Sequence, residues 1–243
     1  NELSGPAVLV ALAQWLQDHK FLNYSYRLIF IPETIGSITY LSKHLEVLKR
    51  NVIAGFNVSC VGDERCYSYV SSRSGASLAD RTAQHVLKNM DINYKTYSWL
   101  HRGSDERQYC APGVDLPVVG FSRSKYGEYP EYHTSLDNLD LISSEGLAGS
   151  YLALMRMIEV IECDVIYKTT VLCEPQLGKR GLYPSLSKKG STFNIKPMMN
   201  FISYCDGTKS VLEIAEIISV PVWDLASLVD QLLIHGLIEQ QIP

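Results

Sequence analysis

The residue types that could do chemistry gather in one short stretch, EYPEYHTSLDNLDL, at residues 128–141. A single histidine, His133, stands there among carboxylates that include Glu131 and Asp137. One neutral imidazole with carboxylates is a suitable set of ligands for Zn²⁺. Asp137 or Glu131 could accept the second ring N–H of His133 and so orient it. An ordinary acidic surface loop is the alternative, and the stretch alone does not decide between the two.

Further polar side chains follow predicted strands or precede a predicted helix. Glu33 follows RLIFIP, Asp63 follows NVSCVG, and Asn1 comes directly before the first helix. Because loops at strand ends converge on one crevice in open α/β sheets, these residues are candidates for the same site. A glutamate beside a metal-bound water is the natural general base. The simpler alternatives are that Glu33 caps a helix and that Asp63 lies in an ion-paired turn. His101 is a weaker candidate for the crevice.

Helices and strands alternate in the part of the chain that must position these residues. Apolar spacing and capping residues predict helices at 3–17, 37–50, 77–90 and 145–164, with Ser4 as the N-cap of the first. Runs rich in β-branched and aromatic residues predict buried strands at 25–32 and 51–62 and a short apolar strand at 116–122. This order predicts an α/β fold, with a mainly parallel mixed sheet sandwiched by helices.

The composition changes near residue 170. Residues 174–192 are rich in Gly, Pro, Ser and Lys, which indicates a linker or exposed loop. Three short helices and a closing strand are then predicted, an order typical of a winged helix. We therefore expect an α/β domain at residues 1–168, and a linker with a small winged-helix-like domain at 169–243.

The bulk composition is that of a folded protein, with 46% hydrophobic and 20% charged residues. A net charge of −4 argues against a surface that binds nucleic acid. No apolar run is long enough to span a membrane and no export signal is seen, so we expect a cytoplasmic protein with free thiols on its six cysteines. The chain begins with Asn1 immediately before a helix, from which we expect an N-terminal part to be missing.

Four segments together resemble, in order, the motifs of the co-catalytic zinc aminopeptidases. NELSGPAVLVALAQWL resembles the Asp-Asn-x-Ser-Gly helix start with its metal-bridging aspartate, and IFIPETIGSITYL resembles the Glu-Glu region. GSDERQYCAPGVDLPVVGF is similar to the family's Gly-Ser-Asp loop and the strand after it, and EYHTSLDNLD to its Tyr-His-Thr metal-ligand segment. The resemblance covers residues 1–160, and the nearest group is bacterial, with a winged-helix tail.

Position by position, the resemblance assigns His133 as the last metal ligand and Glu33 as the general base. Thr34 stands where the family has a metal-binding glutamate, and Asn1 stands where it has the bridging aspartate. Ser59 matches the family's aspartate ligand, so Asp63 would be a ligand only in a rearranged turn. The family's first histidine ligand would lie before Asn1.

The resemblance implies a metal-dependent hydrolase of amide or peptide bonds that uses one or two Zn²⁺ ions. Its substrate would be a peptide or an N-acylated small molecule such as an amino sugar. The departures leave open a single-zinc amidase, with Glu33 as a ligand, or a catalytically inactive binding or scaffold protein whose tail serves protein contacts. No nucleic-acid or membrane partner is expected, and self-association is left open. The expected metal ligands are His133, Asp63, Glu33 and Asn1, and the expected substrate contacts are Tyr132, Arg107 and Asp105.

Overall fold

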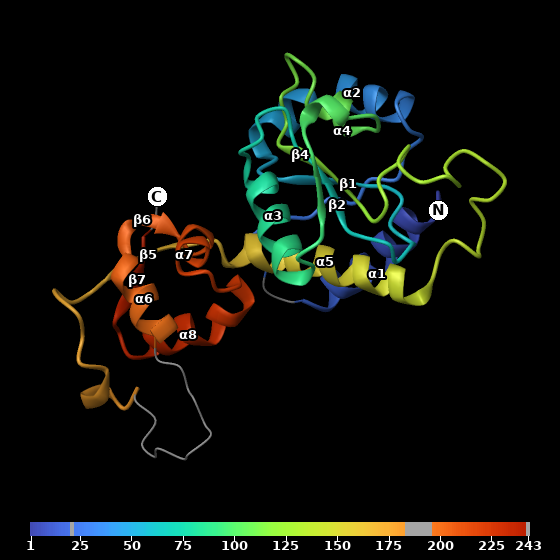
Figure 1. Cartoon of the computed structure of the whole chain (residues 1–243). Helices are drawn as coiled ribbons and strands as arrows, with labels where there is room; N and C mark the ends of the chain where they lie inside the picture. Colours follow the sequence, from blue (N-terminus) through green and yellow to red (C-terminus); the bar gives the residue numbers. More distant parts are fainter. Residues whose placement is uncertain (20–21, 183–195, 242–243) are drawn as a thin grey trace. The chain divides into compact units, whose positions relative to one another are not determined.

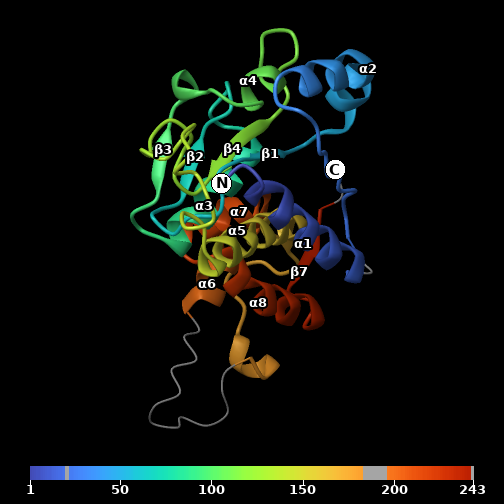
Figure 2. The same ribbon diagram turned by 90° about the vertical axis from the view of Figure 1, so that its right-hand side faces the viewer.

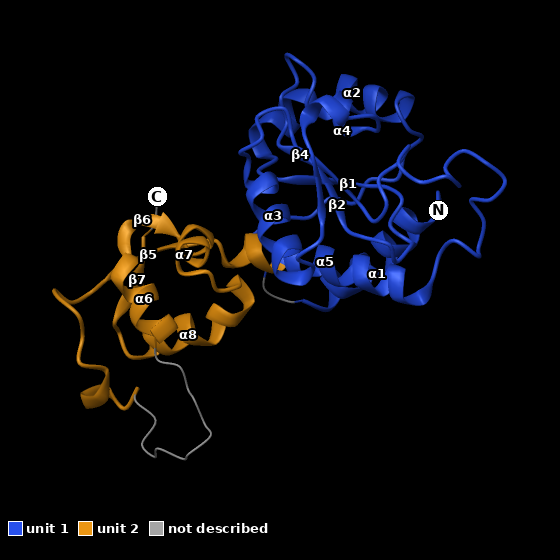
Figure 3. Cartoon of the chain, in the orientation of Figure 1, with its two compact units in different colours: residues 1–158 blue, residues 159–243 orange. Residues whose placement is uncertain are grey.

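The computed structural model describes residues 1–19, 22–182 and 196–241. The chain divides into two compact units, Asn1–Ile158 and Glu159–Pro243, with the boundary inside one long helix (Figure 3). All the candidate site residues belong to unit 1.

Unit 1 contains a four-stranded mixed sheet with the strand order β1-β4-β2-β3. β1 pairs with β4 and β2 with β3 in parallel, whereas β2 and β4 are antiparallel. The sheet lies between α2 and α4 on one side and α1 and α5 on the other (Figures 1 and 2). The predicted α/β fold with a mainly parallel sheet is confirmed. The elements of unit 1 are α1 (Ser4–Asp18), α2 (Ile35–Asn51), β1 (Gly55–Val58), β2 (Ser68–Val70), α3 (Leu78–Met90), β3 (Lys95–Tyr97), η1 (Trp99–His101), α4 (Glu106–Tyr109), β4 (Val118–Ser122) and α5 (Ser144–Cys163).

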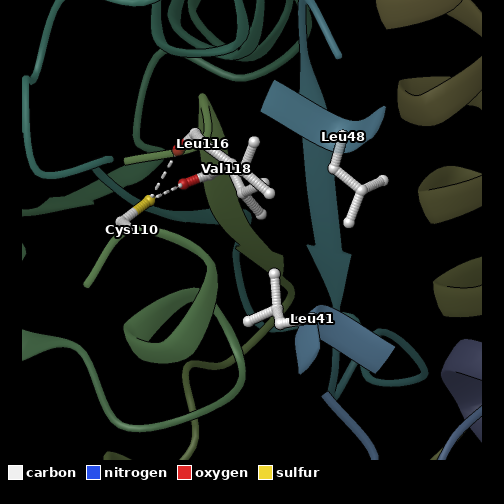
Figure 4. Packing of buried hydrophobic residues seen from close by; sticks show 5 residues of the cluster. All are labelled: Leu41, Leu48, Cys110, Leu116 and Val118. Carbon is white, nitrogen blue, oxygen red and sulfur yellow. Dashed lines mark hydrogen bonds between the residues drawn. The ribbon is translucent and has the colours of Figure 1, made fainter. Parts of the chain in front are cut away.

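The central strand β4 is buried at all five positions, because helices cover both faces of the sheet. One apolar cluster packs α2 against this region through Leu41 and Leu48, together with Leu116 and Val118 (Figure 4). Cys110 completes the cluster, and its thiol donates to the carbonyl oxygens of Leu116 and Val118 at 3.1 and 3.0 Å. Burial raises the pKa of this thiol, so Cys110 stays neutral and serves the core.

The start of α5 is held against the loop that follows β1. Ser143 N donates to Gly62 O at 3.0 Å, and Ser150 Oγ donates to Val61 O at 2.7 Å. At Gly146 a Cβ atom would overlap the carbonyl oxygen of Gly62, so only glycine permits this approach. The helix and the loop therefore have no space between them.

Three local predictions for unit 1 need correction. Residues 25–32 form no strand: they have no ladder partner in the described part of the chain, and Phe30 is 53% exposed. The N-cap of α1 is Leu3 rather than Ser4, whose hydroxyl instead donates to Asn1 O from within the first turn. The predicted buried strand at 51–62 shortens to β1, whose residues are half-buried.

In the described part of unit 2, a three-stranded antiparallel sheet with the order β6-β5-β7 accompanies the helices α6, α7 and α8, and the predicted winged-helix fold is confirmed. Ser210 and Glu213 form a capping box at the start of α7. Most of the predicted linker, from residue 183 onward, lies outside the described residues. The elements of unit 2 are β5 (Ile166–Thr169), η2 (Leu177–Arg180), α6 (Lys196–Tyr204), β6 (Asp206–Ser210), α7 (Val211–Ile218), α8 (Val222–Ile234) and β7 (Ile238–Gln240).

Within the described ranges no single helix is long and apolar enough to cross a membrane. The bent pair α7 and α8 meets that test together, by length and composition alone.

Candidate functional site

The start of α1 and the loop after β1 bring Asn1 and Asp63 together. Asn1 is buried, and its side-chain oxygen accepts a hydrogen bond from Gly62 N at 2.9 Å. Its amide nitrogen faces Asp63 Oδ2 at 3.5 Å. Two of the four residues expected to bind metal are therefore neighbours.

The carboxylate of Asp63 is nevertheless fully used by the fold. It is 2% exposed and accepts from Ser124 N at 3.0 Å and Ser124 Oγ at 2.8 Å. It also accepts from Arg65 N at 3.0 Å. These bonds tie the loop after β1 to the loop after β4, and they occupy the lone pairs that a metal ion would need.

The turn at Glu33 and Thr34 contacts the loop that contains α4. Asp105 Oδ1 accepts from Thr34 N at 2.7 Å and from Ser37 Oγ at 2.9 Å. Arg107 donates to Thr34 Oγ1 at 2.7 Å. Asp105 and Arg107, which we expected to contact substrate, thus hold the start of α2 in place, while the side chain of Glu33 is exposed.

The loop between β4 and α5 contains the other two predicted residues. The rings of Tyr132 and His133 stack with their centroids 4.0 Å apart, and His133 is exposed. Glu131 forms a two-pronged ion pair with Arg65, at 2.7 and 2.8 Å, which lowers the pKa of Glu131 to about 2. The carboxylate next to His133 is therefore bound to an arginine rather than to the imidazole.

A cluster of tyrosines around Cys60 joins these loops, and the sequence did not reveal it. Tyr129 Oη contacts Cys60 Sγ at 3.4 Å and Asp137 Oδ2 at 3.3 Å, and Asp137 also contacts the backbone nitrogen of Asn1. Burial is the main cause that raises the pKa of Tyr132, and electrostatic interactions with Cys60, Glu33 and Asp137 raise it further. The start of α1, the loop after β1 and the loop after β4 thus meet around Cys60, Tyr129 and Tyr132, which we call the tyrosine cluster. The GSDERQY segment instead contacts the turn at Thr34.

The backbone is unusual at three of these loops. Thr34, Cys60 and His133 adopt positive φ angles of 62°, 53° and 58°. Left-handed conformations are unfavourable for residues with a Cβ, and they concentrate at functional sites. The left-handed backbone at these three positions therefore sets the direction in which each side chain leaves the main chain.

The buried carboxylate of Glu106 joins the loop 103–104 to β1 and to the loop after β4 through hydrogen bonds. It is 0% exposed and accepts from Gly103 N, Asn57 Nδ2 and Tyr126 Oη at 2.8, 2.8 and 2.6 Å, and from Ser104 N at 3.1 Å. The GSDERQY stretch at 103–109 resembles the family's Gly-Ser-Asp loop, but nothing near it in the sequence indicates that Glu106 accepts hydrogen bonds from Asn57 and Tyr126.

Burial raises the pKa of several tyrosines, most strongly Tyr69, Tyr126 and Tyr129, and that of Tyr109 to about 12. We expect these four to stay protonated when the native protein is shifted rapidly to pH 11, and to ionise only on unfolding. Since their folded pKa values lie above the ordinary value of about 10, their contribution to stability is complete below pH 10 and is lost as the pH rises through the folded values.

Absorbance at 295 nm, recorded before and after unfolding at pH 11, checks this expectation. Tyr129→Phe should reduce the slow, unfolding-linked step. Ionisation of all the tyrosines of the native protein near pH 10 would contradict it.

The described residues do not fit a two-zinc centre. Nowhere in the ranges 1–19, 22–182 and 196–241 do three His, Cys, Asp or Glu side chains gather closely enough to hold a metal ion. Asp63 is saturated by hydrogen bonds, Asn1 contributes an amide that already accepts from Gly62, and His133 stacks on Tyr132. The arrangement instead offers aromatic faces, a buried thiol and an exposed carboxylate at one convergent site.

Two protein-family models match the chain in succession. A "Domain of unknown function (DUF4910)" matches residues 1–164, and a "winged helix-turn-helix" matches residues 165–240. A "Putative polysaccharide biosynthesis protein with aminopeptidase-like domain" from Clostridium acetobutylicum is 39% identical over 218 residues, covering 88% of this chain and 49% of that protein.

One solved structure matches nearly the whole chain. A "putative peptidase" from Clostridium acetobutylicum has a TM-score of 0.88 and 36% identity, covering 99% of this chain and 54% of that one. An aminopeptidase from Aneurinibacillus sp. strain AM-1 is more distant, with a TM-score of 0.42 and 19% identity over 53% of this chain and 30% of its own. The chain spans about half the length of the first two relatives. The chain therefore belongs to the DUF4910 family over residues 1–164, and a winged helix-turn-helix domain follows it.

Proposed function

We propose that the aminopeptidase-like domain binds a peptide or an N-acylated small molecule at the tyrosine cluster, and that its residues serve recognition rather than zinc-dependent hydrolysis. The observation that supports this most is that the start of α1, the loop after β1 and the loop after β4 meet at the tyrosine cluster, beside an Asp63 carboxylate that is already hydrogen-bonded. In the described part of the chain, this site has no group of three His, Cys, Asp or Glu side chains that could hold a metal ion.

The ligand class follows from the relatives and from the chemistry of the loops. One relative is named for an aminopeptidase-like domain and for polysaccharide biosynthesis, which points to amides of peptides or of amino sugars. Exposed Glu33 offers an acceptor for an ammonium or amide N–H, and the stacked rings of Tyr132 and His133 offer an apolar face. These groups suit a ligand that is part polar and part apolar.

A metal-dependent amide hydrolase is the second candidate. It is favoured by the solved relative described as a putative peptidase, and by His133 at the position of the family's last metal ligand. In that candidate Glu33 would be the base, and zinc would supply Lewis acidity at the site.

The full-length gene product should be equilibrated with Zn²⁺, freed of unbound metal and assayed for metal content. The same sample should be tested for binding and cleavage of Leu-Gly-Gly and of N-acetylglucosamine. We expect substoichiometric zinc, no cleavage, and binding of one probe that weakens about tenfold in His133→Ala through loss of the stacked face. His44→Ala, on the exposed side of α2, is the matched control.

Stoichiometric zinc, with cleavage that Glu33→Gln and His133→Ala both abolish, would establish the hydrolase instead. Failure to bind either probe, together with failure to cleave them, would refute both candidates for these ligand classes.

A further inference from the structure

A pocket lies beside the tyrosine cluster and shares Tyr129 with it. Its volume is about 290 Å³, close to the lower end of the range of roughly 300–1,000 Å³ that is usual for small-molecule sites. Residues at the end of β3, in the loop after β1 and in the loop after β4 line it. Those that matter here are Arg65, Lys95, Tyr97, Lys125, Glu128 and Tyr129.

Lys125 is the unusual residue of this pocket. It is 7% exposed, yet its ammonium group has one hydrogen bond, to Tyr126 O at 3.1 Å. The ammonium also lies 4.2 Å from the ring centre of Tyr126 and 5.2 Å from that of Tyr97. In the described part of the chain no carboxylate forms an ion pair with it.

A buried ammonium group without a carboxylate partner is costly, and the protein only partly offsets that cost. The ammonium has three N–H donors, of which the carbonyl of Tyr126 accepts one. The two aromatic faces give further stabilisation. Burial lowers the pKa of Lys125, although the charges of Glu128 and Glu106 act in the opposite direction. An anion in the pocket would accept hydrogen bonds from the two remaining N–H groups of the ammonium.

The other charged groups favour the same type of ligand. Lys95 is exposed at the pocket, and the charge of Arg65 is balanced by Glu131 outside the lining set. Glu128 is the one acidic side chain among the lining residues, against three basic ones. The pocket therefore has a net positive lining, while Tyr97, Tyr129 and Pro130 add less polar walls.

We propose that this pocket binds the carboxylate or phosphate group of a small molecule of about the size of a monosaccharide or an amino acid, with Lys125 as the central contact. The proposal does not depend on the function proposed for the tyrosine cluster, because its central contact is Lys125, which has no part in that function, and its probes are phosphate and succinate rather than a peptide or an amino sugar.

The test is a titration of the ¹⁵N-labelled chain followed by NMR, with inorganic phosphate in one arm and succinate in the other, at constant ionic strength kept by sodium chloride. We expect saturable shifts of the amide signals of residues 95–97 and 124–129 in at least one arm. Saturation by phosphate alone assigns phosphate esters, and saturation by succinate alone assigns carboxylates; both outcomes support the proposal.

Lys125→Met should weaken the binding about tenfold, because it removes a charge-assisted hydrogen bond. Lys43→Met, on the exposed face of α2, should leave it unchanged. If Lys125→Met fails to fold, Lys95→Met decides, since its exposed side chain can be replaced without loss of packing and its removal should weaken binding about threefold. Absence of saturable shifts in both arms, or equal weakening in Lys43→Met, would overturn the proposal.

Discussion

Replacing Glu106 with alanine is expected to lower the free energy of unfolding of unit 1 by about 4 kcal/mol, the largest effect of any substitution considered for this chain. The carboxylate is completely buried and accepts four hydrogen bonds, from two backbone N–H groups, Asn57 and Tyr126. Removing it leaves those donors buried without acceptors. Glu106→Gln is expected to cost less, about 2 kcal/mol, because it keeps the shape but places an NH₂ group against donors.

Chemical denaturation followed by tryptophan fluorescence measures this effect. Trp15 and Trp99 belong to unit 1 and Trp223 to unit 2, so a Trp223→Phe background restricts the signal to unit 1. Glu46→Ala, on the exposed face of α2, is the matched control and should change the stability by less than about 0.5 kcal/mol. A loss below 1 kcal/mol in Glu106→Ala would mean that these hydrogen bonds are not made in solution.

Asp63→Ala is expected to lower the free energy of unfolding of unit 1 by about 3 kcal/mol, with or without a chelator present. The reason is that Asp63 links two loops through Ser124 and Arg65 rather than holding a metal ion. The serine N–H and hydroxyl, both buried, lose their shared acceptor.

Thermal unfolding of the wild type and of Asp63→Ala, each in EDTA and in Zn²⁺, separates this role from that of a metal ligand. Under the structural role the melting temperature of the wild type is the same in both solutions, and the variant is less stable in both. A wild type that is stabilised by Zn²⁺, with the effect absent from Asp63→Ala, would instead identify Asp63 as a ligand. Asp140→Ala is a suitable control, since this aspartate is exposed.

The fold could be predicted from the sequence wherever a long pattern has one structural outcome. The 116–122 run became β4 because an apolar segment of that length fills a strand buried on both faces. Residues 25–32 have an equally apolar pattern, but a strand also needs a neighbour, which a pattern does not specify. β2 was missed for the opposite reason: its three residues include Ser68, and neighbours on both sides define it as a strand.

The candidate site could be predicted in its segments but not in its bonding. The position of Asp63 after a predicted strand and of Asn1 before a predicted helix made both candidates for one crevice, and the two residues are neighbours in the structure. The sequence cannot show whether a carboxylate is free, because the answer depends on distant partners. Asp63 is occupied by Ser124, 61 residues away, and Glu106 by Tyr126, 20 residues away. The tyrosine cluster was missed because aromatic residues in a loop look the same whether they pack on the core or face solvent.

The close approach of α5 to the loop after β1 determines how the site can respond to a ligand. Gly146 leaves no gap beneath Gly62, and Ser143 and Ser150 fasten the same loop to the helix. A loop fixed in this way would not fold over the ligand that we propose for this site. Selectivity at this loop would then depend on the fit of that ligand to a preformed shape.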